Sequence, residues 1–110
     1  MFDIRKGVIY HTRGDTADFD INVKFDDVPV YDYSAVFSVK KSMKDRTYLY
    51  QVHADENKHI HISHDTTQNL AFGDYFYDIE IHINDDTAEG RYITVGPYAY
   101  HLLADVTVER

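Results

Sequence analysis

Strict alternation of apolar and polar residues is the feature that most constrains the fold of this chain. It is clearest over residues 17–25, 75–83 and 100–108, where every second side chain is apolar or aromatic. Successive side chains of a β-strand point to opposite faces of the sheet, so each segment would carry one apolar face and one largely polar face. Such strands are typical of antiparallel sheets that are buried on one side and wetted on the other.

Shorter segments with the same pattern fill the gaps, at residues 8–12, 35–41, 47–54, 58–64 and 91–95. Turn-forming residues such as Asp26-Asp27 and Gly96-Pro97 separate the segments. This spacing predicts seven to nine short strands joined by hairpins and meanders. A small barrel would also suit that pattern, but we favour an all-β, antiparallel β-sandwich.

Helix is expected in one place at most. Residues 63–70 favour a single helical turn that Asp65 or Thr66 would cap and that would end near Gly73. No linker, repeat or low-complexity tract interrupts residues 1–110, which have the length of one domain. With 44% hydrophobic residues, the chain can bury one core without disulfides. We therefore predict a single sandwich domain.

Charge and composition exclude several classes of partner. The formal net charge is −8, which disfavours nucleic acid and anionic membrane surfaces because both attract basic patches. The chain has no Cys, so it can form neither a disulfide nor a Cys-bearing zinc site. Residues 1–7 lack the apolar region of a secretion signal, and no apolar run is long enough to span a bilayer. Nucleic acid and membranes are therefore not expected as partners.

Four histidines lie close together in the sequence, at His53, His59, His61 and His64. On a strand, His59 and His61 would share one face about 6.5–7 Å apart, which could begin a metal site. His53 or His82 would have to supply a third ligand. The commoner alternative is a polar outer face opposite two buried isoleucines. We predict no metal or other cofactor, and leave open whether this cluster binds a metal ion.

A second polar set, Asp78, Glu80 and His82, shares the polar face of the 75–83 segment. Paired carboxylates can perform acid–base chemistry when one of them is desolvated. Nothing in the sequence predicts desolvation there, because the opposite face takes the core. The chain also lacks a Gly-x-Ser-x-Gly nucleophile motif and a phosphate-binding glycine loop. We predict that the protein is not an enzyme and has no catalytic residues.

The chain is rich in tyrosine, with ten Tyr and no Trp. Tyrosines have a large apolar body and a polar tip, so they suit half-buried strands and contact surfaces alike. An alternative function is therefore that of a carbohydrate-binding module with an exposed tyrosine surface. Its candidates are Tyr31, Tyr33, Tyr48, Tyr50, Tyr92, Tyr98 and Tyr100.

Several segments together resemble a known family. Gly14-Asp15-Thr16 precedes an alternating segment, and residues 35–40 read Ala-Val-Phe-Ser-Val-Lys. Residues 70–79 read Leu-Ala-Phe-Gly-Asp-Tyr-Phe-Tyr-Asp-Ile, and two further strand-like segments, 91–95 and 98–107, close the chain. In this order of motifs the chain resembles the N-terminal domain of the baseplate upper protein of tailed phages and prophages.

The resemblance implies an immunoglobulin-like sandwich that acts in a virion and not in catalysis. It implies a structural or adaptor subunit of a baseplate, tail or neck, present in several copies. Its partners would be other phage structural proteins, itself as a homo-oligomer, or both. The protein would be made in the bacterial cytoplasm, without a secretion signal, and incorporated into the virion.

Overall fold

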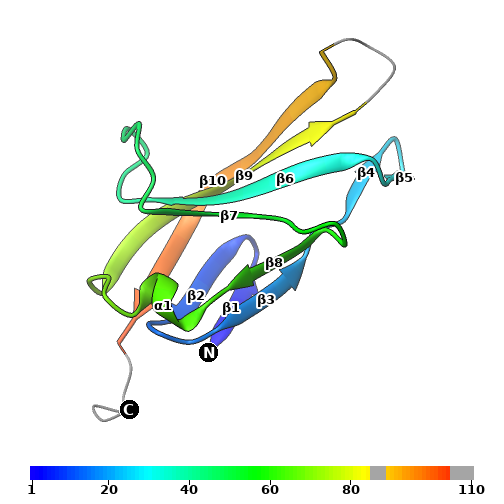
Figure 1. Cartoon of the computed structure of the whole chain (residues 1–110). Helices are drawn as coiled ribbons and strands as arrows, with labels where there is room; N and C mark the ends of the chain where they lie inside the picture. The colour runs from blue at the N-terminus through cyan, green and yellow to red at the C-terminus, as the bar shows by residue number, and fades with distance from the viewer. Residues whose placement is uncertain (85–88, 105–110) are drawn as a thin grey trace.

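The computed structural model describes residues 1–84 and 89–104, which form ten strands and one short helix (Figure 1). The predicted all-β class with a single helical turn is confirmed, although the described strands exceed the expected seven to nine. The elements are β1 (Phe2–Arg5), β2 (Val8–Thr12), β3 (Ala17–Asp20), β4 (Val23–Phe25), β5 (Val28–Val30), β6 (Tyr33–Lys40), β7 (Tyr50–His53), β8 (His59–Ile62), α1 (His64–Thr67), β9 (Gly73–Ile83) and β10 (Arg91–Leu103).

Six strands form the main sheet, in the order β1-β2-β10-β9-β6-β7. All neighbours in it are antiparallel except β2 and β10, which run parallel with Ile9 opposite Tyr100. The prediction of a purely antiparallel sandwich is therefore wrong at this one pairing. Alternation of side chains sets which face is buried, but it carries no information about the direction of the neighbouring strand.

Two small sheets form a second layer. β3 pairs with β8, and β4 pairs with β5, both antiparallel. The alternating segment 17–25 was expected to form one strand, but it divides at Ile21 and Asn22 between these two sheets. Ile21 is buried, at only 8% exposure, so the alternation of buried apolar residues continues across the break between the two strands. Asp26 and Asp27 form the two-residue β4–β5 turn with positive φ values of 51° and 63°, as hairpin turns of this length favour.

Aromatic rings join the two layers. Phe37 on β6 is fully buried, with ring centroids 5.4 Å from Phe19 of the small sheet and 5.4 Å from Tyr77 of β9. Phe19 also stacks on Phe2 of β1 at 5.7 Å. The predicted apolar face of residues 75–83 is confirmed, since Tyr75, Tyr77, Ile81 and Ile83 are buried and Ile79 packs against them.

The closing segment is one long strand instead of two. Gly96-Pro97 was expected to end the 91–95 strand, but β10 continues through it with a shift of register between Val95 and Tyr98. Gly96 has a φ of +105°, and this conformation accommodates a β-bulge without interrupting the strand. The part of the predicted 100–108 strand beyond residue 104 lies outside the described residues.

The single helical turn, α1, is hydrogen-bonded to the connection between β2 and β3. It begins after Ser63, earlier than the predicted caps at Asp65 or Thr66. The amide of Gly14 donates to Thr67 Oγ1 at 2.8 Å, and His64 Nδ1 donates to the Gly14 carbonyl at 2.6 Å. Thr67 is completely buried, so this contact fixes the β2–β3 connection against the turn.

Candidate binding surfaces

Two of the four clustered histidines face aspartates of the neighbouring strand β3. His59 donates from Nδ1 to Asp20 at 2.7 Å and from Nε2 to Asp18 at 2.9 Å. His61 donates from Nδ1 to the same Asp18 oxygen at 2.7 Å. Because carboxylates only accept, both His59 nitrogens must carry protons in this arrangement, which is the charged imidazolium form.

The pKa values of this cluster shift accordingly. Hydrogen bonds to Asp20 and then to Asp18 raise the pKa of His59 above its usual value, against a smaller effect of desolvation. Hydrogen bonds from His61 and His59 lower the pKa of Asp18. Opposite charges within hydrogen-bonding distance stabilise each other's ionised form. The arrangement is that of a surface ion-pair cluster, in which neither His59 nitrogen is free to bind a metal.

The other histidines serve different contacts. His53 lies on β7 opposite Val36, His64 contacts Gly14, and the His82 ring stacks on Tyr92 at 4.2 Å. No group of three or more His, Asp or Glu side chains within residues 1–84 and 89–104 is arranged to hold a metal ion. The described residues therefore do not bring His53 or His82 to the His59–His61 pair.

The Asp78, Glu80 and His82 set lies on the outward face of β9, between β10 and β6. Contrary to the expectation from sequence, Asp78 is partly desolvated, and this burial raises its carboxyl pKa. The positive charge of Lys40 opposes that rise, and the negative charge of Glu80 adds to it. Asp78 lies opposite Ser38 of β6 and next to the β10 bulge at Gly96, and the pattern of a single strand does not reveal such neighbours.

The seven candidate tyrosines do not share one surface. Tyr33 and Tyr100 are buried, at 4% and 0% exposure, so including them in a carbohydrate surface was wrong. Tyr50 points its hydroxyl inward, donating to the Tyr100 hydroxyl at 2.9 Å. The exposed members are Tyr31, Tyr48, Tyr92 and Tyr98.

A neighbouring cation or aromatic ring covers most of the exposed aromatic rings. The covered rings and their neighbours are Phe25 with Arg91, Tyr48 with Lys40, Phe72 with Arg13, Tyr92 with His82 and Tyr98 with Tyr77. Tyr31 differs from all of these, because the residue is 81% exposed and no cation or aromatic ring of the described residues lies over its ring. It is the exposed aromatic whose position the rest of the fold does not explain.

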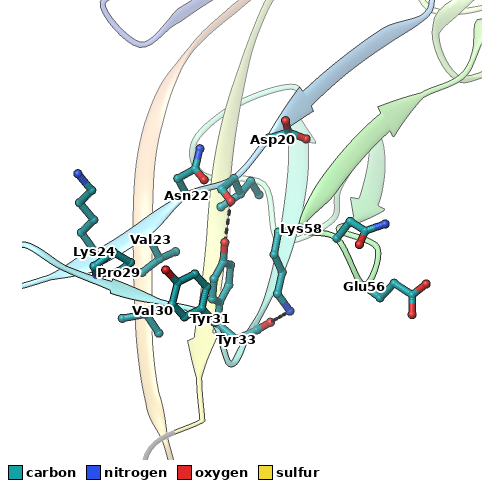
Figure 2. Close-up of a pocket in the computed structure, with 12 residues that line it drawn as sticks. Asp20, Asn22, Val23, Lys24, Pro29, Val30, Tyr31, Tyr33, Glu56 and Lys58 are labelled. Atoms are coloured by element: carbon teal, nitrogen blue, oxygen red, sulfur yellow. Dashed lines mark hydrogen bonds between the residues drawn. The ribbon is translucent and has the colours of Figure 1, made fainter.

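Tyr31 lines an open groove of about 950 Å³ (Figure 2). Three segments meet there: residues 20–24 from the end of β3 into β4, residues 29–31 and 33 from β5 to the start of β6, and residues 56–58 before β8. The Tyr33 hydroxyl donates to the Ile21 carbonyl at 2.6 Å, and Lys58 Nζ donates to the Tyr33 carbonyl at 2.5 Å. These two bonds hold the base of the groove in place.

A second groove, of about 280 Å³, shares Asp20, Ile21 and Asn22 of the β3–β4 connection with the first. Its lining is mostly apolar and includes Ile4, Phe19, Ile79 and Val95. Ile4 and Val95 are 44% and 37% exposed, although both belong to strands of the main sheet. The small second layer therefore leaves part of the apolar inner face of the main sheet open to solvent.

Comparison of the chain with models of known protein families, with curated proteins and with solved structures gave no match in any of the three. The resemblance to the phage baseplate module therefore stays a prediction. No helix in the described part of the chain is long and apolar enough to cross a membrane.

Proposed function

We propose that this chain is a non-catalytic structural or adaptor subunit of a tailed-phage or prophage virion, acting by protein–protein assembly in a baseplate, tail or neck. The observation that carries the proposal is the apolar groove lined by Ile4, Phe19, Ile79 and Val95. An apolar cleft between two sheets is stabilised when a partner covers it. The sequence resemblance over residues 14–16, 35–40 and 70–79 supports the location in a virion.

A second copy of this chain is the occupant we assign to the apolar groove. Ile4 belongs to β1, which is an outermost strand of the main sheet, and its side chain lines the groove. An outermost strand offers unpaired backbone groups for pairing with another strand. Two copies related by a two-fold axis would join their β1 edges and bury Ile4 of each copy, which is the usual symmetry of homodimers.

Analytical ultracentrifugation of the whole chain tests this assembly. We expect the wild-type protein to associate reversibly, and Ile4→Asp or Val95→Asp to shift it towards monomer because each would bury a charge at the interface. Thr94→Asp is the matched control, since Thr94 is exposed on β10 beside Val95 but does not line the groove. A wild-type protein that stays monomeric at high concentration would contradict self-assembly.

The virion location needs a separate measurement. We expect mass spectrometry of purified particles, produced by the phage or prophage that encodes this chain, to detect the protein at several copies per particle. Genes for tail, baseplate or fibre components should lie beside its gene. Complete particles that lack the protein would argue against a virion role, even if the isolated chain forms dimers.

A further inference from the structure

Tyr31 presents a flat ring to solvent at the edge of the larger groove. Figure 2 shows it beside Tyr33, with Asn22 above and Lys58 on the far side of Tyr33. Tyr31 is 81% exposed, and its hydroxyl makes no hydrogen bond within residues 1–84 and 89–104. Leaving an aromatic ring in water is unfavourable, so a ring held on an ordered connection suits the stacking of a ligand.

Polar groups that can bond sugar hydroxyls line the same groove as this ring. The side-chain amides of Asn22 and Asn57 line the groove and form no hydrogen bond to other described residues, so each retains donors and an acceptor. Lys58 Nζ uses one donor on the Tyr33 carbonyl and keeps further donors. Val23 and Val30 add an apolar wall to the groove. A volume of about 950 Å³ falls within the usual range of small-ligand sites.

Charge selects the class of ligand. The charged side chains that line the groove are two acids and two bases, Asp20, Glu56, Lys24 and Lys58, so their formal charges cancel. The whole chain carries −8, which disfavours a polyanionic ligand. A ligand with many hydroxyl groups, no net charge and an apolar face for the tyrosine ring matches this lining.

We infer that the groove beside Tyr31 binds a neutral saccharide chain, with one sugar ring stacked on Tyr31 and its hydroxyls bonded by Asn22, Asn57 and Lys58. This inference goes beyond the assembly role and does not depend on it, because Tyr31, Asn57 and Lys58 do not line the apolar groove, although the two grooves share Asp20, Ile21 and Asn22. A single chain could carry both surfaces at once.

An array of neutral and anionic microbial glycans tests the site, with the full chain as the probe protein. We expect binding to neutral oligosaccharides, and the best array ligand should shift the amide resonances of Asn22, Tyr31 and Lys58 in NMR titration of the labelled protein. Tyr31→Ala should weaken its affinity at least about tenfold, as truncation of a central aromatic anchor does. The fold should tolerate this change because Tyr31 is 81% exposed.

Tyr92→Ala is the matched control, since Tyr92 is 58% exposed but stacks on His82 and does not line the groove. It should bind the same oligosaccharide as wild type.

Three results would overturn the inference: no binding to any neutral glycan on the array, binding to anionic glycans alone, or an equal loss of affinity in both variants. Loss of self-association in Tyr31→Ala, without glycan binding by wild type, would also overturn it and assign the groove to a protein partner. Ile4→Asp should keep glycan binding, so the two proposals can fail separately.

Discussion

The Tyr100 hydroxyl lies 2.5 Å from Nδ1 of His11 in the core, although the two residues are 89 positions apart in the sequence. The parallel pairing of β2 with β10 brings them together. Nε2 of His11 lies 2.8 Å from the Asp15 carbonyl, and a carbonyl only accepts, so Nε2 carries the proton. Burial favours the neutral form of His11, so its Nδ1 accepts from the Tyr100 hydroxyl, which in turn accepts from the Tyr50 hydroxyl.

This chain of hydrogen bonds, from Tyr50 through Tyr100 to His11, predicts the effect of removing the Tyr100 hydroxyl. Tyr100→Phe would leave the buried Nδ1 of His11 without a donor and the Tyr50 hydroxyl without an acceptor. We expect unfolding free energy to fall by about 1–3 kcal/mol, the usual cost of unsatisfied buried polar groups. Urea denaturation measures this loss of unfolding free energy. Tyr98→Phe serves as the control because Tyr98 is 43% exposed. Equal denaturation midpoints for both variants would contradict a stabilising role of these hydrogen bonds.

The burial of His11 in the same chain of hydrogen bonds predicts how the stability of the fold depends on pH. Burial lowers the pKa of His11 below its usual value, because desolvation penalises the imidazolium. The unfolded chain therefore binds the proton more readily. The contribution of neutral His11 to stability is complete above about pH 6.5 and is lost as pH falls from there through the lowered pKa of the folded state. NMR titration of the imidazole resonances should give His11 a midpoint below about 6.5. A midpoint above that value would contradict a buried neutral imidazole.

Much of this fold could be predicted from local alternation. The buried faces of residues 17–23 and 75–83 and the Asp26-Asp27 turn follow from side-chain period and turn chemistry alone. β1 and β5 were not predicted, because four residues or fewer carry too little pattern. The parallel β2–β10 pair and the bulge at Gly96 depend on which strands become neighbours, which the period of a single strand does not encode.

The candidate surfaces could be predicted less well, and for a similar reason. His59 and His61 do share one face, but the sequence did not indicate that Asp18 and Asp20 of β3 would be their partners. Tyr31 was one of seven equivalent tyrosines until the structure showed which rings are covered. His11 reads as a polar residue in a short strand, and only the arrangement of three distant strands reveals that it is buried.

The bulge in β10 gives a prediction about backbone conformation. Gly96 has a φ of +105°, and a Cβ at this position would come 2.9 Å from the Tyr77 carbonyl oxygen. Gly96→Ala should therefore destabilise the protein by about 1–3 kcal/mol, from strain and from displacement of β9. Thermal unfolding measures the loss, with Thr94→Ala as a control at an exposed position of the same strand. An unchanged melting temperature in Gly96→Ala would show that the strand can absorb a side chain there.

The cluster on β3 and β8 predicts an ordering of two substitutions. The hydrogen bond to Asp20 contributes most to the raised pKa of His59, and the bond to Asp18 comes second. Asp20→Asn should therefore lower the His59 titration midpoint more than Asp18→Asn does, as NMR of the imidazole resonances would show. A raised pKa makes the contribution of charged His59 to stability complete below about pH 6.5, and that contribution disappears as pH rises through the folded-state value. This is opposite in sign to the effect of His11, whose midpoint should stay unchanged in both variants. The reverse order of the two substitutions would mean that Asp18 is the main partner of His59.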